Sequence, residues 1–265
     1  MNKLNIIYLY FFIKKSLFDF GLYFTIGLSG RTPSQHHCGE LINITALDLT
    51  ACSLSDTLLP DAITITAITL KLSKNNLNSV DVSSFKKFTL LTELYLDNNK
   101  IICIEAGAFL ALTNLAILWL NNNQLCSIHS GLLRGLSNLE VLWLEGNRIT
   151  DVDADSFKDL VNLKHLSLSS NKLESFNRTA FSELSHLTYL GLSANHLTKI
   201  EKKLLKKFAK LKTLRLDFNS IYSIEPRSFQ RLGDLTYLYV PVSLKDSVAI
   251  YLLLLTRPSL KGYIS

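Results

Sequence analysis

The sequence predicts a curved α/β solenoid, in which similar coils stack in a row with a parallel sheet on the concave side and short helices or turns on the convex side. Three observations lead to this prediction. An asparagine recurs every 24 residues, a Leu-x-Leu pair precedes each asparagine, and a phenylalanine or leucine follows each one at a fixed distance. Self-similarity with a fixed period is typical of repeat proteins, which stack one small unit many times.

The asparagine column keeps its spacing without a slip. Its members are Asn75, Asn99, Asn123, Asn147, Asn171, Asn195 and Asn219. A side-chain amide both donates and accepts hydrogen bonds, so it can satisfy backbone groups where the chain turns off a strand. We therefore predict that these residues form a structural ladder and bind no ligand.

The apolar columns predict the strand and the opposite side of each coil. In pairs such as Leu94-x-Leu96 and Leu118-x-Leu120, both leucines point to one face of a short strand. One such strand cannot bury its apolar face alone, but stacked copies make a parallel sheet with a continuous core. A second column is predicted to fill the convex side: Phe85, Phe109, Leu133, Phe157, Phe181, Leu205 and Phe229.

These columns resemble the typical, 24-residue class of extracellular leucine-rich repeats, LxxLxLxxNxLxxIxxxxFxxLxxL. Toll-like receptor ectodomains, Slit, small leucine-rich proteoglycans and lamprey variable lymphocyte receptors share this class. The resemblance covers residues 67–240 and implies a leucine-rich-repeat horseshoe with its binding surface on the concave side. It is specific for the fold and weak for the function, because one fold hosts many functions.

The N-terminal residues 1–29 are predicted to be a secretory signal peptide. The stretch is apolar apart from a few charges, among them Lys14, Lys15 and Asp19, and small residues precede a cleavage after Ser29. A lysine near the middle of a bilayer costs about 2.5–3.5 kcal/mol, which disfavours one continuous span. An uncleaved anchor and a mispredicted start are the alternatives.

Residues 30–66 are predicted to form an N-terminal cap with a first, irregular repeat. There the frame Leu47-x-Leu49-x-x-Cys52 has cysteine in place of asparagine, and Leu59-Pro60-x-x-Ile63 resembles the stretch that follows cysteine caps in Toll-like receptors. That resemblance implies a disulfide between Cys38 and Cys52, which would contribute about 3 kcal/mol. Two free buried thiols are the alternative.

Cys103 and Cys126 lie in adjacent coils, so they could form a second disulfide or remain two free, semi-buried thiols, and the sequence does not separate these alternatives. Residues 241–265 break the repeat frame at Pro241. We expect either a helical cap from Ser243 to Leu255, with a start resembling a capping box at Ser243 and Asp246, or a truncated end.

Catalytic and cofactor sites are not predicted. The sequence has no phosphate-binding loop, nucleophile elbow or zinc-protease motif, and its net charge of +6 is too mild to indicate nucleic-acid binding. Asp151-x-Asp153-x-Asp155 resembles a calcium loop, but Ser156 replaces the required glycine and Asn162 the required glutamate. We interpret it as a solvated acidic turn, and we expect neither a metal, a cofactor nor an enzyme.

Two sequons, at Asn43 and Asn177, predict N-glycosylation, in agreement with the signal peptide and the cap cysteines. A separate lysine cluster runs from Lys202 to Lys212 on one convex segment. It could bind a glycosaminoglycan or an anionic membrane, or simply be a solvated helical face.

The candidate binding site is an aromatic patch between the strand leucines. Side chains between those leucines point out of the core, and both tryptophans of the chain fall there. The predicted ligand-binding residues are Tyr95, Ile117, Trp119, Val141, Trp143, Glu93, Asp97, Glu145 and Tyr189. An aromatic and aliphatic patch with a polar rim is typical of a protein-binding hot spot.

Three functions are consistent with these features. The first is an extracellular recognition module that resembles a receptor ectodomain, is secreted or lies on the outer face of the plasma membrane, and binds a protein or glycoconjugate ligand, a co-receptor or a second copy of itself. The second is a matrix or adhesion scaffold of the leucine-rich proteoglycan type. The third is an intracellular adaptor.

Overall fold

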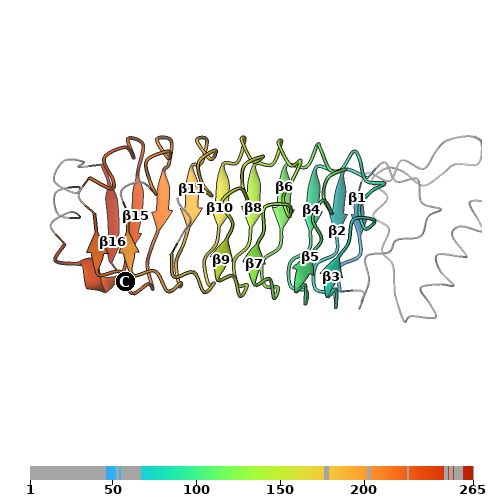
Figure 1. The fold of residues 1–265 in the computed structure, drawn as a ribbon, viewed down its shortest axis with the longest axis horizontal. Helices are drawn as coiled ribbons and strands as arrows, with labels where there is room; N and C mark the ends of the chain where they lie inside the picture. Colours follow the sequence, from blue (N-terminus) through green and yellow to red (C-terminus); the bar gives the residue numbers. More distant parts are fainter. Residues whose placement is uncertain are drawn as a thin grey trace, which may run out of the picture.

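The structure is a computed structural model, and it describes residues 46–51, 54, 67–175, 179–201, 204–225, 227–247, 250, 253 and 259–264. Within these ranges the chain winds into a row of coils that each contribute one short strand to a single sheet (Figure 1). The prediction of a repeat solenoid with a parallel sheet is confirmed.

The sheet has ten strands, and every pairing between neighbours is parallel. In spatial order the strands are β1 (Ala46–Asp48), β2 (Thr69–Lys71), β4 (Glu93–Tyr95), β6 (Ile117–Trp119), β8 (Val141–Trp143), β10 (His165–Ser167), β11 (Tyr189–Gly191), β13 (Thr213–Arg215), β15 (Tyr237–Val240) and β16 (Lys261–Ile264). Sequence order and spatial order coincide, so each coil contacts mainly the coil before it and the coil after it.

The register is as regular as the sequence period. Leu94 pairs with Leu118, and Leu118 with Leu142, at a constant offset of 24 residues. The offset persists to the last strand, where Tyr239 pairs with Tyr263. Identical positions of successive coils therefore lie side by side and form straight columns across the sheet.

The opposite side of the coils consists of turns and two-residue strands. These strands are β3 (Ser79–Val80), β5 (Cys103–Ile104), β7 (Ser127–Ile128), β9 (Asp151–Val152), β12 (Lys199–Ile200) and β14 (Ser223–Ile224), and they pair as β3–β5, β7–β9 and β12–β14. Between them run turns closed by hydrogen bonds three residues apart, such as Leu112 N to Phe109 O and Leu115 N to Leu112 O. Of the two predicted alternatives for this side, helices or turns, the described coils have turns.

The core is continuous along the whole row. Both leucines of each pair from Leu70 to Leu216 are at most 1% exposed, and Phe109 is fully buried. Aromatic rings of adjacent coils touch on the side away from the sheet, since the centroids of Phe85 and Phe109 are 5.9 Å apart and those of Phe157 and Phe181 are 5.4 Å apart.

The asparagines form a ladder at the turn after each strand. The Asn147 amide nitrogen donates to the carbonyl oxygens of Leu144, at 2.9 Å, and of Leu120 in the previous coil, at 3.0 Å. Its side-chain oxygen accepts from the backbone N–H of Leu125, at 3.1 Å. Donors and acceptors of two coils are thus satisfied by one buried side chain, and the same bonds recur from Asn75 to Asn219.

The residue before each ladder asparagine adopts a left-handed backbone conformation. The members are Lys74, Asn98, Asn122, Gly146, Ser170, Ala194 and Phe218, with φ between 52° and 68°. In this conformation the backbone N–H of Asn98 still donates to Asn121 O of the next coil, so the hydrogen bonding of the sheet continues into the turn. Ala51 has the same conformation, with φ of 57°, directly before the cysteine that replaces asparagine in the first coil.

The C-terminal part adds a strand that the repeat pattern did not predict. A short 3-10 helix, η1 (Val242–Leu244), follows β15, and β16 then pairs with β15. The Ser243 hydroxyl donates to the carbonyl oxygen of Ile221, and the N-cap residue of η1 is Pro241, which makes no side-chain capping hydrogen bond. Ser243 therefore does not start a capping box, because its hydroxyl bonds to the preceding coil.

Candidate functional site

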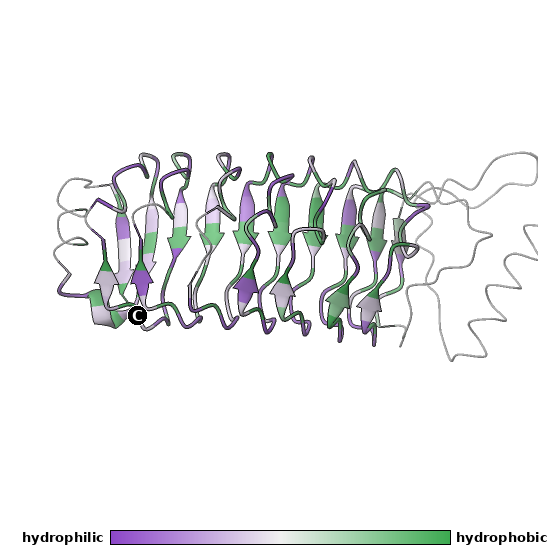
Figure 2. Ribbon diagram, viewed as in Figure 1, coloured by the Kyte–Doolittle hydropathy of each residue, from purple (hydrophilic) through white to green (hydrophobic). Residues whose placement is uncertain are grey.

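The outward side chains of the ten-stranded sheet form three columns, which we call the sheet face. In each coil they occupy the residue before the first leucine, the residue between the leucines and the residue after the second leucine, as in Glu93, Tyr95 and Asp97. The strands β6 and β8 carry the most hydrophobic segment of this face, between the more polar β4 and β10 (Figure 2).

An aromatic row crosses the middle of the sheet face, and we define it as Tyr95, Trp119, Trp143 and Tyr189. The ring centroids of Tyr95 and Trp119 are 4.9 Å apart in an edge-to-face arrangement, and those of Trp119 and Trp143 are 6.4 Å apart. Trp119 is 37% exposed, and the other three rings are half-buried. Such contacts between aromatic side chains contribute about 0.5–1.5 kcal/mol beyond burial, so the row is a pre-organised surface.

The row continues over a coil that has no aromatic residue in the middle column. The rings of Trp143 on β8 and Tyr189 on β11 stack at 6.1 Å across β10, and Ser167 between them is only 1% exposed. A Cβ atom on Gly191 would lie 2.9 Å from the Ser167 hydroxyl oxygen and 3.2 Å from the Tyr189 ring. Ser167 and Gly191 are therefore buried although they occupy the middle column, because their small size lets the neighbouring rings close over them.

Carboxylates flank the aromatic row, but they differ in accessibility. Glu93 accepts hydrogen bonds from the hydroxyls of Thr69 and Tyr95, and Glu145 accepts one from Ser167. Both are half-buried. Asp97 is only 7% exposed, because it accepts hydrogen bonds from the Ser73 hydroxyl at 2.5 Å and the Asn98 amide at 2.6 Å. The carboxylate of Asp97 was predicted to bind a ligand, but it is buried and held by hydrogen bonds within the sheet.

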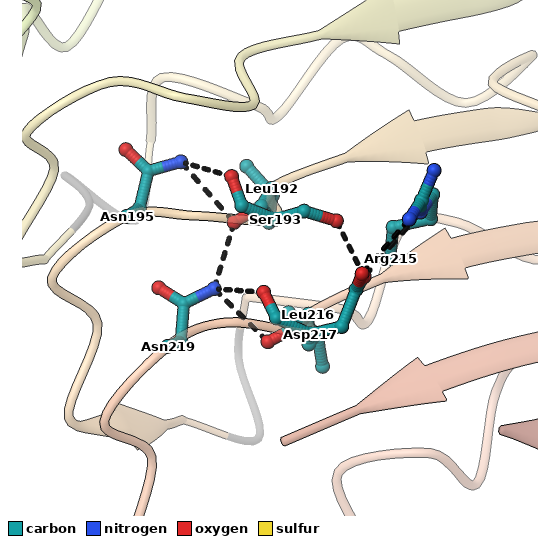
Figure 3. Close-up of polar contacts among 7 residues, drawn as sticks. All are labelled: Leu192, Ser193, Asn195, Arg215, Leu216, Asp217 and Asn219. Atoms are coloured by element: carbon teal, nitrogen blue, oxygen red, sulfur yellow. Dashed lines mark hydrogen bonds and ion pairs between the residues drawn. The ribbon is translucent and has the colours of Figure 1, made fainter. Parts of the chain in front are cut away.

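The C-terminal end of the sheet face carries an ion pair between a half-buried arginine and a buried aspartate, next to the asparagine ladder (Figure 3). The carboxylate of Asp217 accepts hydrogen bonds from the Ser193 hydroxyl and from the Arg215 guanidinium, with a shortest nitrogen–oxygen distance of 2.8 Å. The same guanidinium lies 4.9 Å from the ring centroid of Tyr239, which stacks on Tyr263 at 4.7 Å.

The pKa of Asp217 is lowered by this arrangement. Burial alone raises the pKa of the carboxyl group, but the hydrogen bonds from Arg215 and Ser193 and the positive charge of Arg215 outweigh it. A lowered pKa in the folded state means that the carboxylate stabilises the fold fully above the unfolded pKa, about 4, and that this contribution is lost as the pH falls through the folded pKa.

We therefore expect Asp217→Asn to reduce the free energy of unfolding by about 1–2 kcal/mol at pH 7, because the guanidinium loses a charged hydrogen-bond partner. The difference from the unmodified protein should shrink at pH 3, because this pH is below the unfolded pKa of about 4 and the stability contributed by the lowered pKa is being lost there. Urea unfolding at both pH values measures this, and Asp234→Asn, at an exposed carboxylate, is the matched control. An equal loss at pH 7 and pH 3 would contradict the electrostatic explanation.

His165 and Tyr95 on the sheet face also have shifted pKa values. Burial lowers the pKa of His165, and Lys164 lowers it further, against the opposing effect of Glu140. The imidazole stacks on Tyr189 at 6.2 Å. Burial raises the pKa of Tyr95, and its hydrogen bond to Glu93 adds to the increase. Both side chains are therefore neutral at pH 7, and they act through packing and hydrogen bonding.

Comparison with known proteins establishes the family. Leucine-rich repeat patterns match residues 68–125, 89–149, 137–197 and 185–241, which together cover more than half of the chain. The chain belongs to the leucine-rich repeat family. Leucine-rich repeats are protein-binding modules, so the general function follows from the family. No curated protein sequence matches this leucine-rich repeat protein significantly.

The two described cysteines of this leucine-rich repeat protein are free and exposed. A bridge between Cys103 and Cys126, which the sequence left open, is not formed. The reason is the register: the 24-residue offset places Ser127, and not Cys126, in the column of Cys103, and β5 pairs with β3 rather than with β7. The alternative of two free thiols is confirmed, but both side chains are exposed and not semi-buried.

Most of the lysine cluster and the acidic turn, two further sites considered in the sequence, lie on the described coils. Lys206, Lys207, Lys210 and Lys212 are exposed on a turn segment and not on a helix. Asp153 accepts a hydrogen bond from the backbone N–H of Ser130. Within the described ranges, no group of three or more His, Cys, Asp or Glu side chains is placed to hold a metal ion. None of the helices in the described part of the chain is long and apolar enough to span a bilayer.

Several predictions fall outside the described residues. They are the signal peptide at residues 1–29, the disulfide between Cys38 and Cys52, the glycosylation sites Asn43 and Asn177, and the lysines Lys202 and Lys203. These stay predictions.

Sequence analysis missed a second, exposed ladder on the other edge of the sheet. The side-chain amides of Asn114, Asn138 and Asn162 donate to the carbonyl oxygens of Thr89, Thr113 and Ser137, at 2.8–3.0 Å. His186 continues the column through a contact with Val161 O. The 24-residue spacing of these three asparagines was the available signal.

Proposed function

We propose that this leucine-rich repeat protein is an extracellular recognition module that binds a protein or glycoconjugate ligand on its sheet face. The observation that carries the proposal is the aromatic row, which places two tryptophans and two tyrosines in contact on one outward surface. Tryptophan and tyrosine dominate the binding energy of protein interfaces, because they bury a large area with little loss of side-chain entropy.

We propose that the chain acts by binding and carries out no catalysis. The sequence offers no catalytic motif. The pKa shifts of Tyr95, His165 and Asp217 on the sheet face are each explained by burial, hydrogen bonds or nearby charges. The aromatic row is therefore the centre of the function and no cofactor is needed.

The proposal of an extracellular location rests on the apolar N-terminal segment and on the sequons at Asn43 and Asn177. Expression of the whole chain in animal cells tests it. We expect the protein in the medium or on the cell surface, with a mass that decreases after endoglycosidase treatment. Retention in the cytosol without glycan would favour the intracellular adaptor. A matrix scaffold remains the second extracellular candidate, and deposition into the matrix of the same cultures would favour it.

The role of the aromatic row is tested by Trp119→Ala and Trp143→Ala, separately and together. We expect the double variant to lose more than 90% of the binding of fluorescent tetramers of the protein to receptive cells or matrix, since removal of a hot-spot residue costs about 2 kcal/mol or more. Thermal stability should fall only modestly, because the rings lie outside the core and each lost contact between them contributes about 0.5–1.5 kcal/mol.

The matched control is Tyr222→Ala, which removes an aromatic side chain that is 74% exposed and lies away from the sheet face. Binding by this variant should equal that of the unmodified protein. Full binding by the tryptophan variants would refute the sheet face as the recognition surface.

A further inference from the structure

At the C-terminal end of the sheet face, two basic side chains of the chain itself pack on tyrosine rings. The Arg215 guanidinium lies over the Tyr239 ring, with 4.9 Å between its central carbon and the ring centroid, and Asp217 holds it through a salt bridge. Lys261 lies over Tyr237 in the same way, at 5.6 Å. A cation, an aromatic ring on a neighbouring coil and a carboxylate two residues along the strand thus form one unit.

The part of the aromatic row that lies on β4, β6 and β8 has two of these three components. The middle column supplies aromatic rings where β13 has Arg215, and the flanking columns supply carboxylates. The three columns hold nine residues in these coils, with three acids and no base, and of the acids Asp97 is buried while Glu93 and Glu145 are half-buried. The nine residues are Glu93, Tyr95, Asp97, Ile117, Trp119, Asn121, Val141, Trp143 and Glu145. The nearest lysine in the middle column, Lys71, is already paired with Asp48 at 3.6 Å.

The polar groups around Trp119 and Trp143 can form further hydrogen bonds and ion pairs. Neither Glu93 nor Glu145 forms a salt bridge with any residue that the structure describes. The indole N–H groups of Trp119 and Trp143 likewise have no hydrogen-bond partner within the described coils. A tryptophan face attracts a cation more strongly than a tyrosine or phenylalanine face does, and nearby carboxylates add charge-assisted hydrogen bonds.

We propose that Trp119 and Trp143, flanked by Glu93 and Glu145, bind an arginine-rich segment of a protein partner. Guanidinium groups of the partner take the position over the rings that Arg215 takes over Tyr239. One arginine donates to Glu93 at one end of the tryptophan pair and a second arginine donates to Glu145 at the other end. Arginine suits this site better than lysine, because its planar group stacks on a ring while it hydrogen-bonds in its own plane. The inference rests on the proposed function, since it names the partner of the same sheet face.

Intrinsic fluorescence tests the proposal directly, because Trp119 and Trp143 are the two tryptophans of the chain. The whole protein is titrated with capped hexa-arginine, hexalysine and hexaglutamate peptides. We expect a saturable change in tryptophan emission with hexa-arginine, weaker binding of hexalysine and no response to hexaglutamate.

Charge-neutral variants distinguish this site from general attraction of a polycation. Removing one exposed charge-assisted contact costs about 0.7–1.4 kcal/mol, so Glu145→Gln should raise the dissociation constant of hexa-arginine about three- to tenfold and Glu93→Gln/Glu145→Gln about tenfold or more. Glu174→Gln, at an exposed glutamate away from the sheet face, is the matched control and should change it less than twofold. Equal weakening by the control and the double variant would overturn the inference.

A tetramethylammonium titration separates arginine recognition from general cation binding. This ion stacks on aromatic rings but has no N–H group to donate to Glu93 or Glu145. Affinity for tetramethylammonium equal to that for hexa-arginine, or no fluorescence response to hexa-arginine, would also overturn the inference. The proposed function would stand in those cases if Trp119→Ala/Trp143→Ala still abolished binding to cells or matrix, and it would fail independently if that variant bound normally.

Discussion

Asn147→Leu is expected to destabilise the protein by about 3–5 kcal/mol. The substitution keeps the size of the side chain but removes every hydrogen bond that Asn147 makes. It leaves the buried N–H of Leu125 without a partner. The carbonyl oxygens of Leu120 and Leu144 each lose one of two ladder hydrogen bonds and keep those from Asn123 and Asn171. Each buried polar group that loses its partner costs about 1–3 kcal/mol.

Urea unfolding followed by circular dichroism measures this effect. The matched control is Asn138→Leu, which makes the same change in the exposed second ladder, where one hydrogen bond to Thr113 is lost next to water. We expect the control to cost less than about 1 kcal/mol, since solvent can replace the lost partner. A similar loss in both variants would show that burial of the first ladder contributes little to stability.

Phe109→Ala is the second large effect, with an expected loss of about 3–5 kcal/mol. The Phe109 ring is fully buried and stacks on Phe85 of the preceding coil, so its removal leaves a cavity between coils. The fold is a row in which each coil contacts its neighbours, and we therefore expect hydrogen exchange to accelerate mainly around the mutated coil.

Phe218→Ala is the control for this experiment, because the Phe218 side chain is 64% exposed. Its free energy of unfolding should change by less than about 0.5 kcal/mol. Uniform acceleration of exchange along the whole row in Phe109→Ala would show that the coils unfold as one cooperative unit.

The periodic part of the fold was predictable because each column has one physical role. Buried positions such as Leu94 and Leu96 require an apolar side chain of fixed size, and Asn99 requires an amide, so the pattern stays visible in one sequence. The fold class and the outward position of Trp119 and Trp143 follow directly from that pattern.

The convex side was harder to predict, because its apolar residues are compatible with two backbone conformations. Phe109, Leu112 and Leu115 are spaced three residues apart, which suits one face of a helix. In the structure the same residues are linked by successive hydrogen bonds across three residues, which make turns. Both conformations bury the same side chains, so the apolar pattern alone does not separate them.

The candidate site was predicted in composition but not in geometry. The sequence identified the aromatic residues, but the closure of Trp143 and Tyr189 over Ser167 depends on ring packing across two coils. The strand β16 was not predicted, because Gly262 stands in its leucine column. β16 pairs with β15 at the same 24-residue offset, and Tyr263 stacks on Tyr239. A search for leucine pairs does not detect such a strand.

The constant register has a consequence for how this molecule can change length. An insertion or deletion of one whole 24-residue coil leaves every other column aligned, whereas any other length change inside the row shifts leucines and asparagines out of step. Duplication of the coil that holds Trp119 would extend the tryptophan surface by one ring, and loss of that coil would bring Tyr95 beside Trp143. The reach of the recognition surface can therefore vary in steps of a single coil while the architecture stays intact.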